Sequence, residues 1–201
     1  MTARLQTAMN VVIVALFTLL CMGSLHAYRA SGSLQSFGVL AINTLFLGLF
    51  LTRRPAKAET SSAPLWLLGF AGTALPLLLR PAAAAAANGA SLGAVIEAAG
   101  LVMLAAALLS LRRSFAVVPG NRGIRSGGMY RLVRHPVYLS ELTVLLGVVL
   151  VNPTALNAVI WACECALQFA RARAEERFLA ADPSYTLYCT RVRHRLIPWL
   201  V

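Results

Sequence analysis

The segment Arg131–Leu142, "RLVRHPVYLSEL", begins with ionisable side chains and continues as an apolar run. One further ionisable side chain lies inside the apolar run. Two arginines and His135 precede Pro136, and Glu141 lies among the apolar residues that follow. Histidine and glutamate can transfer protons, and a charged residue within a membrane segment usually faces a cavity or a partner. This spacing indicates a polar site at the mouth of a membrane helix, with Glu141 pointing into a reaction cavity.

A second set of polar residues lies on the next apolar run. Glu164, Gln168, Arg171 and Glu175 are spaced i, i+4, i+7 and i+11, so a helix would carry them on one face. An antiparallel helical hairpin would place Glu141 and Glu164 at similar depth. The pattern predicts a polar stripe that runs from mid-membrane to the cytoplasmic tail, with the two acids as candidates for function. The alternative is that these acids and arginines pair with one another for packing.

The composition is typical of an integral membrane protein. Only 12% of the 201 residues are charged, whereas soluble domains carry about 25%. The net charge of +11 would suit nucleic acid, but the basic residues lie between apolar blocks and towards the C-terminus, as in membrane proteins. We therefore expect a lipid environment and no nucleic-acid partner. The four cysteines lack metal-ligand spacing, so no metal site is predicted.

Six apolar elements must position the polar residues. They are Met9–Tyr28, Leu34–Thr52, Ala63–Leu79 and Leu92–Leu111, followed by the hairpin arms Pro136–Leu150 and Ala155–Ala170. A spanning helix needs about 20 apolar residues, so the first hairpin arm is short. We expect an all-α, polytopic transmembrane bundle of about five to six membrane segments, with a cytosolic C-terminal cap. Residues 1–111 would form four transmembrane helices, and residues 112–201 a core of polar loop, hairpin and amphipathic tail.

Several local features refine this prediction. Pro76 predicts a kink in the third segment. The alanine-rich stretch at 81–91 is expected to be a connector, and Glu97 is expected at the membrane interface. In the hairpin turn, Pro153 suits a first helical position and Asn152 the cap before it.

Basic residues alternate between the loops. The loops after the second and fourth segments and the C-terminal tail are rich in arginine, whereas the loops after the first and third carry only Arg29 and Arg80. This asymmetry predicts that the basic loops and both termini are cytoplasmic. The alanine-rich composition, with arginine preferred over lysine, indicates a bacterial chain and therefore an inner-membrane location.

Over Arg112–Pro198 the sequence resembles the isoprenylcysteine carboxyl methyltransferase family, within the wider group of integral-membrane methyltransferases that includes phospholipid methyltransferases. The family order is Gly-x-Tyr, Arg-His-Pro-x-Tyr, a hairpin, Glu-Glu, two tyrosines three apart and a basic run ending in proline. The matching residues are Gly128, Tyr130, Arg134, His135, Pro136, Tyr138, Glu175, Glu176, Tyr185, Tyr188, Arg193, Arg195 and Pro198. The combination is specific, although each piece alone is weak.

The resemblance implies S-adenosylmethionine as cofactor, in a cytosolic pocket that lipid reaches from between the helices. It implies that the backbone at Arg134, Pro136 and Tyr138, with His135, holds the amino-acid end of the cofactor. Glu176 would bind its ammonium or a ribose hydroxyl. The adenine would lie among three further residues, which are Tyr185, Tyr188 and Leu196. His135 could instead serve only to cap the helix that Pro136 begins.

The methyl acceptor is expected to be lipidic or amphiphilic. A carboxylate acceptor needs a cation to orient it, and Arg173 and Arg113, or its neighbour Arg112, match family arginines. An amine or thiol acceptor needs proton removal, for which Glu141 or His135 would serve. Oligomeric state is not predicted.

The sequence departs from the family at Ser140, where glycine is usual, at Glu141, where an apolar residue is usual, and at Asp182-Pro183, where Phe-Gly is common. These departures put the acceptor in doubt. Two other functions stay open. "HPVYLSE" also resembles a segment of NADPH-dependent reductases of the steroid-reductase type, and the scaffold could belong to a non-catalytic membrane protein. Tyr130 and Trp199 would serve equally well as interfacial anchors. No strand–helix alternation supports a Rossmann methyltransferase.

Overall fold

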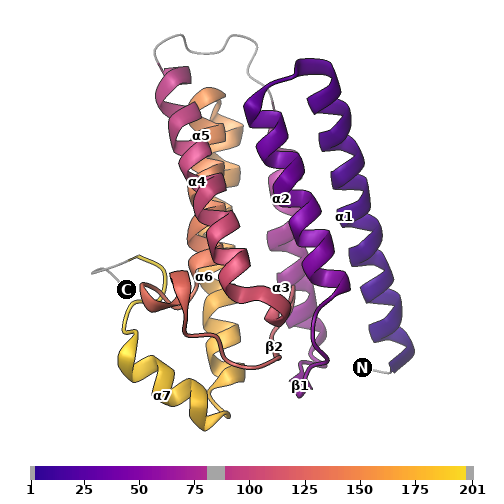
Figure 1. Cartoon of the computed structure of the whole chain (residues 1–201), viewed down its shortest axis with the longest axis vertical. Helices are drawn as coiled ribbons and strands as arrows, with labels where there is room; N and C mark the ends of the chain where they lie inside the picture. The colour runs from indigo at the N-terminus through magenta and orange to yellow at the C-terminus, as the bar shows by residue number, and fades with distance from the viewer. Residues whose placement is uncertain (1–2, 81–88, 198–201) are drawn as a thin grey trace.

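The apolar segments form helices that pack side by side along most of their length (Figure 1). The computed structural model describes residues 3–80 and 89–197. Its helices are α1 (Ala3–Ser31), α2 (Leu34–Leu51), α3 (Ala63–Ala74), α4 (Gly89–Leu111), α5 (Pro136–Val151), α6 (Ala155–Leu179) and α7 (Pro183–Arg191). Short 3₁₀ turns are η1 (Leu75–Leu78), η2 (Arg112–Ser114) and η3 (Gly128–Arg131), and the strands are β1 (Ala58–Glu59) and β2 (Gly120–Asn121). The predicted all-α bundle is confirmed.

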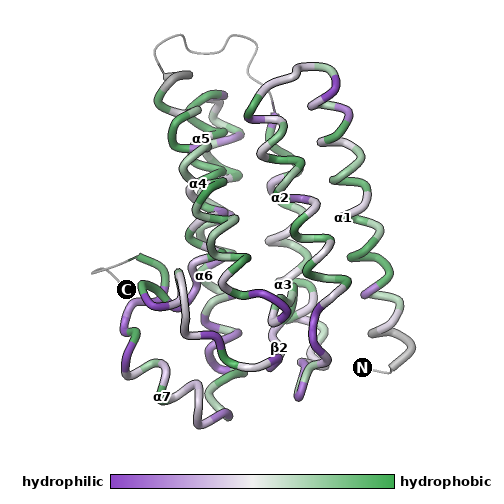
Figure 2. Tube along the Cα trace, in the orientation of Figure 1, coloured by the Kyte–Doolittle hydropathy of each residue, from purple (hydrophilic) through white to green (hydrophobic). Residues whose placement is uncertain are grey.

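Three helices are long and apolar enough to cross a membrane. These candidate spans are Thr7–Ser31, Leu34–Leu51 and Leu92–Ser114, and Ala63–Leu78 and Pro136–Val151 are shorter apolar helical segments. Large hydrophobic side chains such as Leu19, Leu67 and Val102 are mostly exposed on these helices. Figure 2 shows the apolar colouring along the bundle and the hydrophilic colouring at one end. The chain is therefore an integral membrane protein.

The polar elements gather at one end of the bundle, which we call the polar end. The start of α1, the loops that contain β1 and β2, and helix α7 all lie there (Figure 1). The α1–α2 connection and the α5–α6 turn lie at the opposite end. This arrangement agrees with the alternation of basic loops in the sequence.

Two predicted local features have different outcomes. At the expected kink, α3 ends at Ala74 and the 3₁₀ turn η1, which contains Pro76, follows it. The expected cap at Asn152 is wrong, because Asn152 ends α5 and Pro153 lies in the turn. Thr154 begins α6 instead, and its hydroxyl accepts a hydrogen bond from the Asn157 amide at 3.1 Å. A threonine hydroxyl, like an asparagine side chain, can satisfy this unpaired amide.

Helices α4 and α5 pack closely because glycines lie between them. A Cβ added at Gly147 would collide with the Glu97 backbone, and one at Gly100 would lie 2.6 Å from the Val144 nitrogen. Glu97, expected at the membrane interface, is only 3% exposed and accepts a hydrogen bond from Gln35. The alanine run at 82–87, Pro198 and Trp199 lie outside the described residues.

A two-stranded ribbon joins the two loops at the polar end. β1 pairs antiparallel with β2, with Ala58 opposite Asn121 and Glu59 opposite Gly120. Next to the ribbon, Arg122 forms a buried salt bridge of 2.7 Å with Glu59. These contacts hold the loop after α4 against the end of the bundle, where it contributes to the cavity described below.

Candidate active site

The start of α5 is fixed by proline chemistry and by a segment that follows α7. Pro136 occupies the first turn, where its missing N–H costs no hydrogen bond. His135 takes the capping position, but its side chain makes no capping hydrogen bond. The amides of Arg134 and His135 donate to the carbonyls of His194 and Arg195, both at 2.9 Å. The chain after α7 is thereby attached to the start of α5.

Glu176 on α6 joins these two segments electrostatically. Its carboxylate lies 3.1 Å from Arg134 Nη1, 3.2 Å from His135 Nε2 and 2.6 Å from Arg195 Nη2. Burial raises the pKa of Glu176, but hydrogen bonds from His135 and Arg195 outweigh burial and lower this pKa to about 2. Glu176 is thus an anion held by protein groups. Its contact with a cofactor stays a prediction, because Arg134 and His135 line the cavity described below and Glu176 does not.

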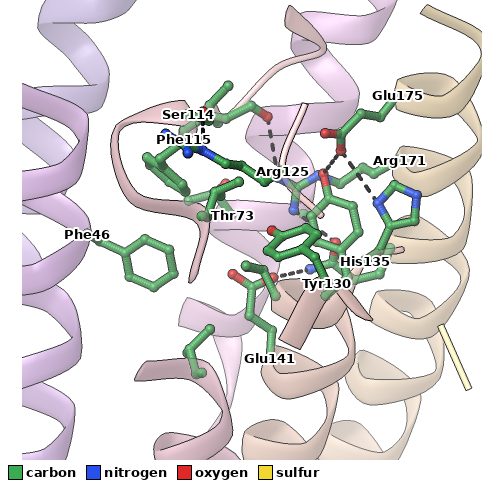
Figure 3. A pocket seen from close by; sticks show the side chains of 18 of the residues that line it. Phe46, Thr73, Ser114, Phe115, Arg125, Tyr130, His135, Glu141, Arg171 and Glu175 are labelled. Atoms are coloured by element: carbon green, nitrogen blue, oxygen red, sulfur yellow. Dashed lines mark hydrogen bonds and ion pairs between the residues drawn. The ribbon is translucent and has the colours of Figure 1, made fainter. Parts of the chain in front are cut away.

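A cavity of about 360 Å³ opens where the α5–α6 hairpin meets the loop after α4 (Figure 3). Its lining includes all four residues of the predicted stripe, Glu164, Gln168, Arg171 and Glu175, and also Glu141. One face of α6 thus lines the cavity together with Glu141.

Gln168 connects the two acids of the hairpin. Its side-chain amide donates to Glu141 Oε2 and to Glu164 Oε1, both at 2.8 Å. The Gln168 carbonyl accepts a hydrogen bond of 3.0 Å from Arg171 Nη1, and Arg171 Nη2 donates to the Val117 carbonyl at 3.3 Å. This network places both acids on one wall of the cavity. That placement agrees with the expectation that Glu141 and Glu164 lie at similar depth in the hairpin.

His135 lies between two neighbouring carboxylates. Its Nε2 faces Glu176, and its Nδ1 lies 3.7 Å from Glu175 Oε2. The Tyr138 hydroxyl donates to that same Glu175 oxygen at 3.0 Å, and the centres of the stacked His135 and Tyr138 rings lie 5.4 Å apart. Figure 3 shows His135 beside Glu175. Glu175 was predicted as part of the stripe and of the family's Glu-Glu pair, but was given no role at the site. Of the Glu175–Glu176 pair, it is Glu175 that belongs to the cavity lining.

Three tyrosines form the aromatic wall at the polar end. Tyr130, Tyr185 and Tyr188 are all buried and line the cavity. The Tyr188 hydroxyl donates to the Tyr130 carbonyl at 2.8 Å, and the rings of Tyr185 and Tyr188 lie 5.9 Å apart. Burial raises the pKa of both phenols, so they stay protonated at neutral pH. The wall offers flat apolar faces and hydroxyl groups.

The opposite wall is apolar and comes from the N-terminal helices. Phe17, Phe46 and Leu101 contribute from α1, α2 and α4, and Phe115 follows α4. Figure 3 shows Phe46 across the cavity from Tyr130 and Glu141. The cavity is therefore amphiphilic, with one polar side and one apolar side.

Other predicted residues lie outside this lining. Arg113 is exposed and donates to the Thr52 carbonyl at 2.6 Å, and Arg173 is exposed with its guanidinium 5.2 Å from the Phe169 ring centre. Pro136 and Leu196 are buried but do not line the cavity. Their roles stay predictions. Arg171 is the arginine of this part of α6 that lines the cavity. It was expected there from the polar stripe and not from the family resemblance.

Unpaired polar atoms cluster at the cavity. Within the described ranges, the buried side-chain atoms without a hydrogen-bond partner are Arg122 Nε and Nη1, Arg134 Nε, Glu164 Oε2 and Tyr185 Oη. All four residues line the cavity. Buried polar groups in native proteins are normally hydrogen-bonded, so this cluster indicates a site for a polar ligand. The described residues include no group of three potential ligands that could hold a metal ion.

One known family model matches the segment around this cavity. Residues 93–181 match the model of the isoprenylcysteine carboxyl methyltransferase (ICMT) family, which confirms the resemblance over α4 to α6. The match begins within α4 and ends before Tyr185 and Tyr188, so these tyrosines lie outside it. No curated protein matches the chain.

Proposed function

We propose that this chain is an S-adenosylmethionine-dependent methyltransferase with a lipidic or amphiphilic acceptor. The chain is an integral membrane protein, and one segment of it matches the isoprenylcysteine carboxyl methyltransferase family. The family match supports methyl transfer in general. The observation that carries the proposal is the amphiphilic cavity and its unpaired polar atoms. A cavity of about 360 Å³ is of the size that holds small molecules and cofactors.

The polar side of the cavity suits the chemical groups of S-adenosylmethionine. Arg134 Nε and the first-turn amides of Val137 and Tyr138 would hold its carboxylate, since amides at a helix start have no partner within the helix. The Glu175 carboxylate would hold its ammonium. Tyr185 and its aromatic neighbours would contact the adenine and offer a hydroxyl. In this arrangement Glu176 acts by holding Arg134 and His135 in place.

The cofactor would supply a methyl group on a positively charged sulfur, and the protein would hold the methyl group and the acceptor in position. Methyl transfer is an in-line displacement, so holding acceptor and methyl in line contributes most of the rate. The apolar wall of Phe17, Phe46 and Leu101 would hold the hydrocarbon part of the acceptor. The same wall excludes water from the reacting groups, which strengthens the electrostatic interactions inside the cavity.

The family resemblance implies a carboxylate acceptor, which requires a cation near the reacting oxygen. The predicted arginines Arg113 and Arg173 are exposed outside the lining, whereas Arg171 lies within it. If the acceptor is a carboxylate, Arg171 is therefore the better candidate to orient it. The reductase alternative would need the cavity to hold NADPH, a much larger dinucleotide.

Titration calorimetry on the detergent-purified chain tests the cofactor. We expect saturable binding of S-adenosylmethionine and none of NADPH. Glu176→Ala should weaken S-adenosylmethionine binding about tenfold or more, the loss that 1.4 kcal/mol of binding energy would give. Glu97→Gln removes another buried carboxylate, away from the cavity, and should leave binding unchanged. NADPH binding alone would favour the reductase, and binding of neither would favour a non-catalytic protein.

A further inference from the structure

Glu164 is an unusual group for the interior of a membrane bundle. The residue is 0% exposed, lies on α6 and lines the cavity. Its Oε1 accepts a hydrogen bond from Gln168, but its Oε2 has no partner in the described part of the chain. A buried acceptor left unpaired is costly. A ligand that donates hydrogen bonds at this point would remove that cost.

Glu141 makes the same wall more acidic. Both carboxylates share a single donor, the Gln168 amide, so neither is saturated by it. The nearest cation, Arg171, directs its hydrogen bonds to the Gln168 and Val117 carbonyl oxygens and stacks 4.8 Å from the centre of the Tyr138 ring. Among the described residues, Arg171 forms no salt bridge with either acid. The wall thus has more carboxylate oxygens than hydrogen-bond donors to satisfy them.

The ligand that fits such a wall carries donors or positive charge on its polar group. It also carries an apolar part, because Phe17, Phe46 and Leu101 line the other side of the same cavity. A carboxylate group would bring a further negative charge next to Glu141 and Glu164. Like charges in a poorly solvated site repel strongly, so a carboxylate is the less favourable acceptor at this wall.

We propose that the methyl acceptor is an amphiphile with a primary or secondary amine, whose ammonium is bound by Glu141 and Glu164. This inference rests on the proposed methyltransferase function and names its substrate class. One proton passes from the ammonium to the carboxylate pair, which frees the nitrogen lone pair. The N–C bond then forms as the C–S bond of S-adenosylmethionine breaks, and the sulfur keeps the bonding electrons. The products are the N-methylammonium, the neutral thioether and one proton, which leaves to solvent.

Octylamine and octanoate test the proposal, because they share a chain length and differ in charge. Binding of each is measured by calorimetry on the full chain in a non-ionic detergent, without cofactor. We expect octylamine to bind at least tenfold more tightly than octanoate. Glu164→Gln should remove this preference, and Glu164→Asp should keep part of it. Glu97→Gln is the matched control and should retain the preference, since Glu97 is buried outside the cavity.

S-adenosylmethionine binding is measured on the same preparations, so that the methyltransferase proposal and the amine proposal are tested separately. Binding of the cofactor by Glu164→Gln would show that this variant is folded. With the cofactor present, mass spectrometry should detect N-methyloctylamine and no methyl octanoate. Equal binding of the two probes, a preference for octanoate, or a preference that survives Glu164→Gln would overturn the amine inference and leave the methyltransferase proposal standing. Absence of S-adenosylmethionine binding would overturn both.

Discussion

At the scale of single residues, the most informative contrast is between Arg171 and Arg173. Both lie on α6 two residues apart, but only Arg171 reaches the cavity. The family resemblance favoured Arg173, whereas the helical stripe favoured Arg171. A motif match transfers a residue's role by its place in the sequence. The spacing of polar residues on a helix reports the direction in which each side chain points.

Arg171→Ala should lower methyl transfer by about 100-fold, because Arg171 holds Gln168 and, through it, both acids of the cavity wall in position. Arg173→Ala should change the rate less than about threefold, because an exposed arginine contributes little. The measurement is kcat/KM with the acceptor class identified by the binding experiments. The opposite ranking of the two variants would restore Arg173 as the catalytic arginine.

Glu176 makes a pH-dependent contribution to stability. Its pKa falls from the ordinary value of 4.5 to about 2 in the folded chain. The unfolded chain therefore binds the proton more tightly, and the stabilisation is present above pH 4.5 and lost as the pH falls towards 2. Thermal unfolding in detergent should show a steeper acid loss of stability for the native chain than for Glu176→Gln. Parallel pH profiles would contradict the ion-pair network.

At the scale of the elements, the sequence predicted the helices well and the α5–α6 turn less well. Long apolar runs in a membrane form helices, because each backbone polar group must be hydrogen-bonded within the segment. In "VNPT" both Asn152 and Thr154 can cap a helix, and the sequence alone does not decide which one does. The structure assigns the cap to Thr154.

Two variants distinguish these caps. Thr154→Ala should lower the free energy of unfolding by about 1 kcal/mol, the usual cost of a lost N-cap. Pro153→Ala should change it much less, since Pro153 lies in the turn outside both helices. Denaturation in a mild detergent, compared between the two variants, checks this. A larger loss for Pro153→Ala would favour the cap at Asn152.

The close packing of α4 on α5 gives a second prediction for an element. Gly147→Ala places a methyl group against the Glu97 backbone and should cost about 1–3 kcal/mol through overpacking. Gly48→Ala on α2 is the matched control, because a Cβ there meets no atom within 4 Å. Gly48→Ala should be neutral or slightly stabilising, since alanine favours helix over glycine. Equal effects of the two variants would contradict this packing.

At the scale of the whole molecule, the sequence predicted the membrane class and the alternation of loops, and the family match supports the methyltransferase class. It did not predict the network that binds Glu176 to Arg134, His135 and Arg195. Those residues lie far apart in the chain, and helical spacing carries information only within one helix. Pairing between distant segments depends on how the helices pack, which one sequence does not specify.

The predicted orientation can be tested by cysteine labelling. In a background without the four native cysteines, Arg54→Cys and Gly32→Cys place thiols at opposite ends of the bundle. We expect an impermeant maleimide added to intact cells to label Gly32→Cys and to spare Arg54→Cys until the membrane is opened. The reverse result would invert the topology and place the polar end outside the cytoplasm.

The hydrogen bonds from Arg134 and His135 to the carbonyls of residues that follow α7 have a consequence for biosynthesis. A ribosome makes the start of α5 long before it makes His194 and Arg195. During translation, α5 and α6 can therefore enter the bilayer while the start of α5 still lacks the segment that supports it. The cavity would then be completed abruptly, late in synthesis, when α7 and the residues after it are made. A nascent or prematurely terminated chain would occupy the membrane with an unfinished cavity.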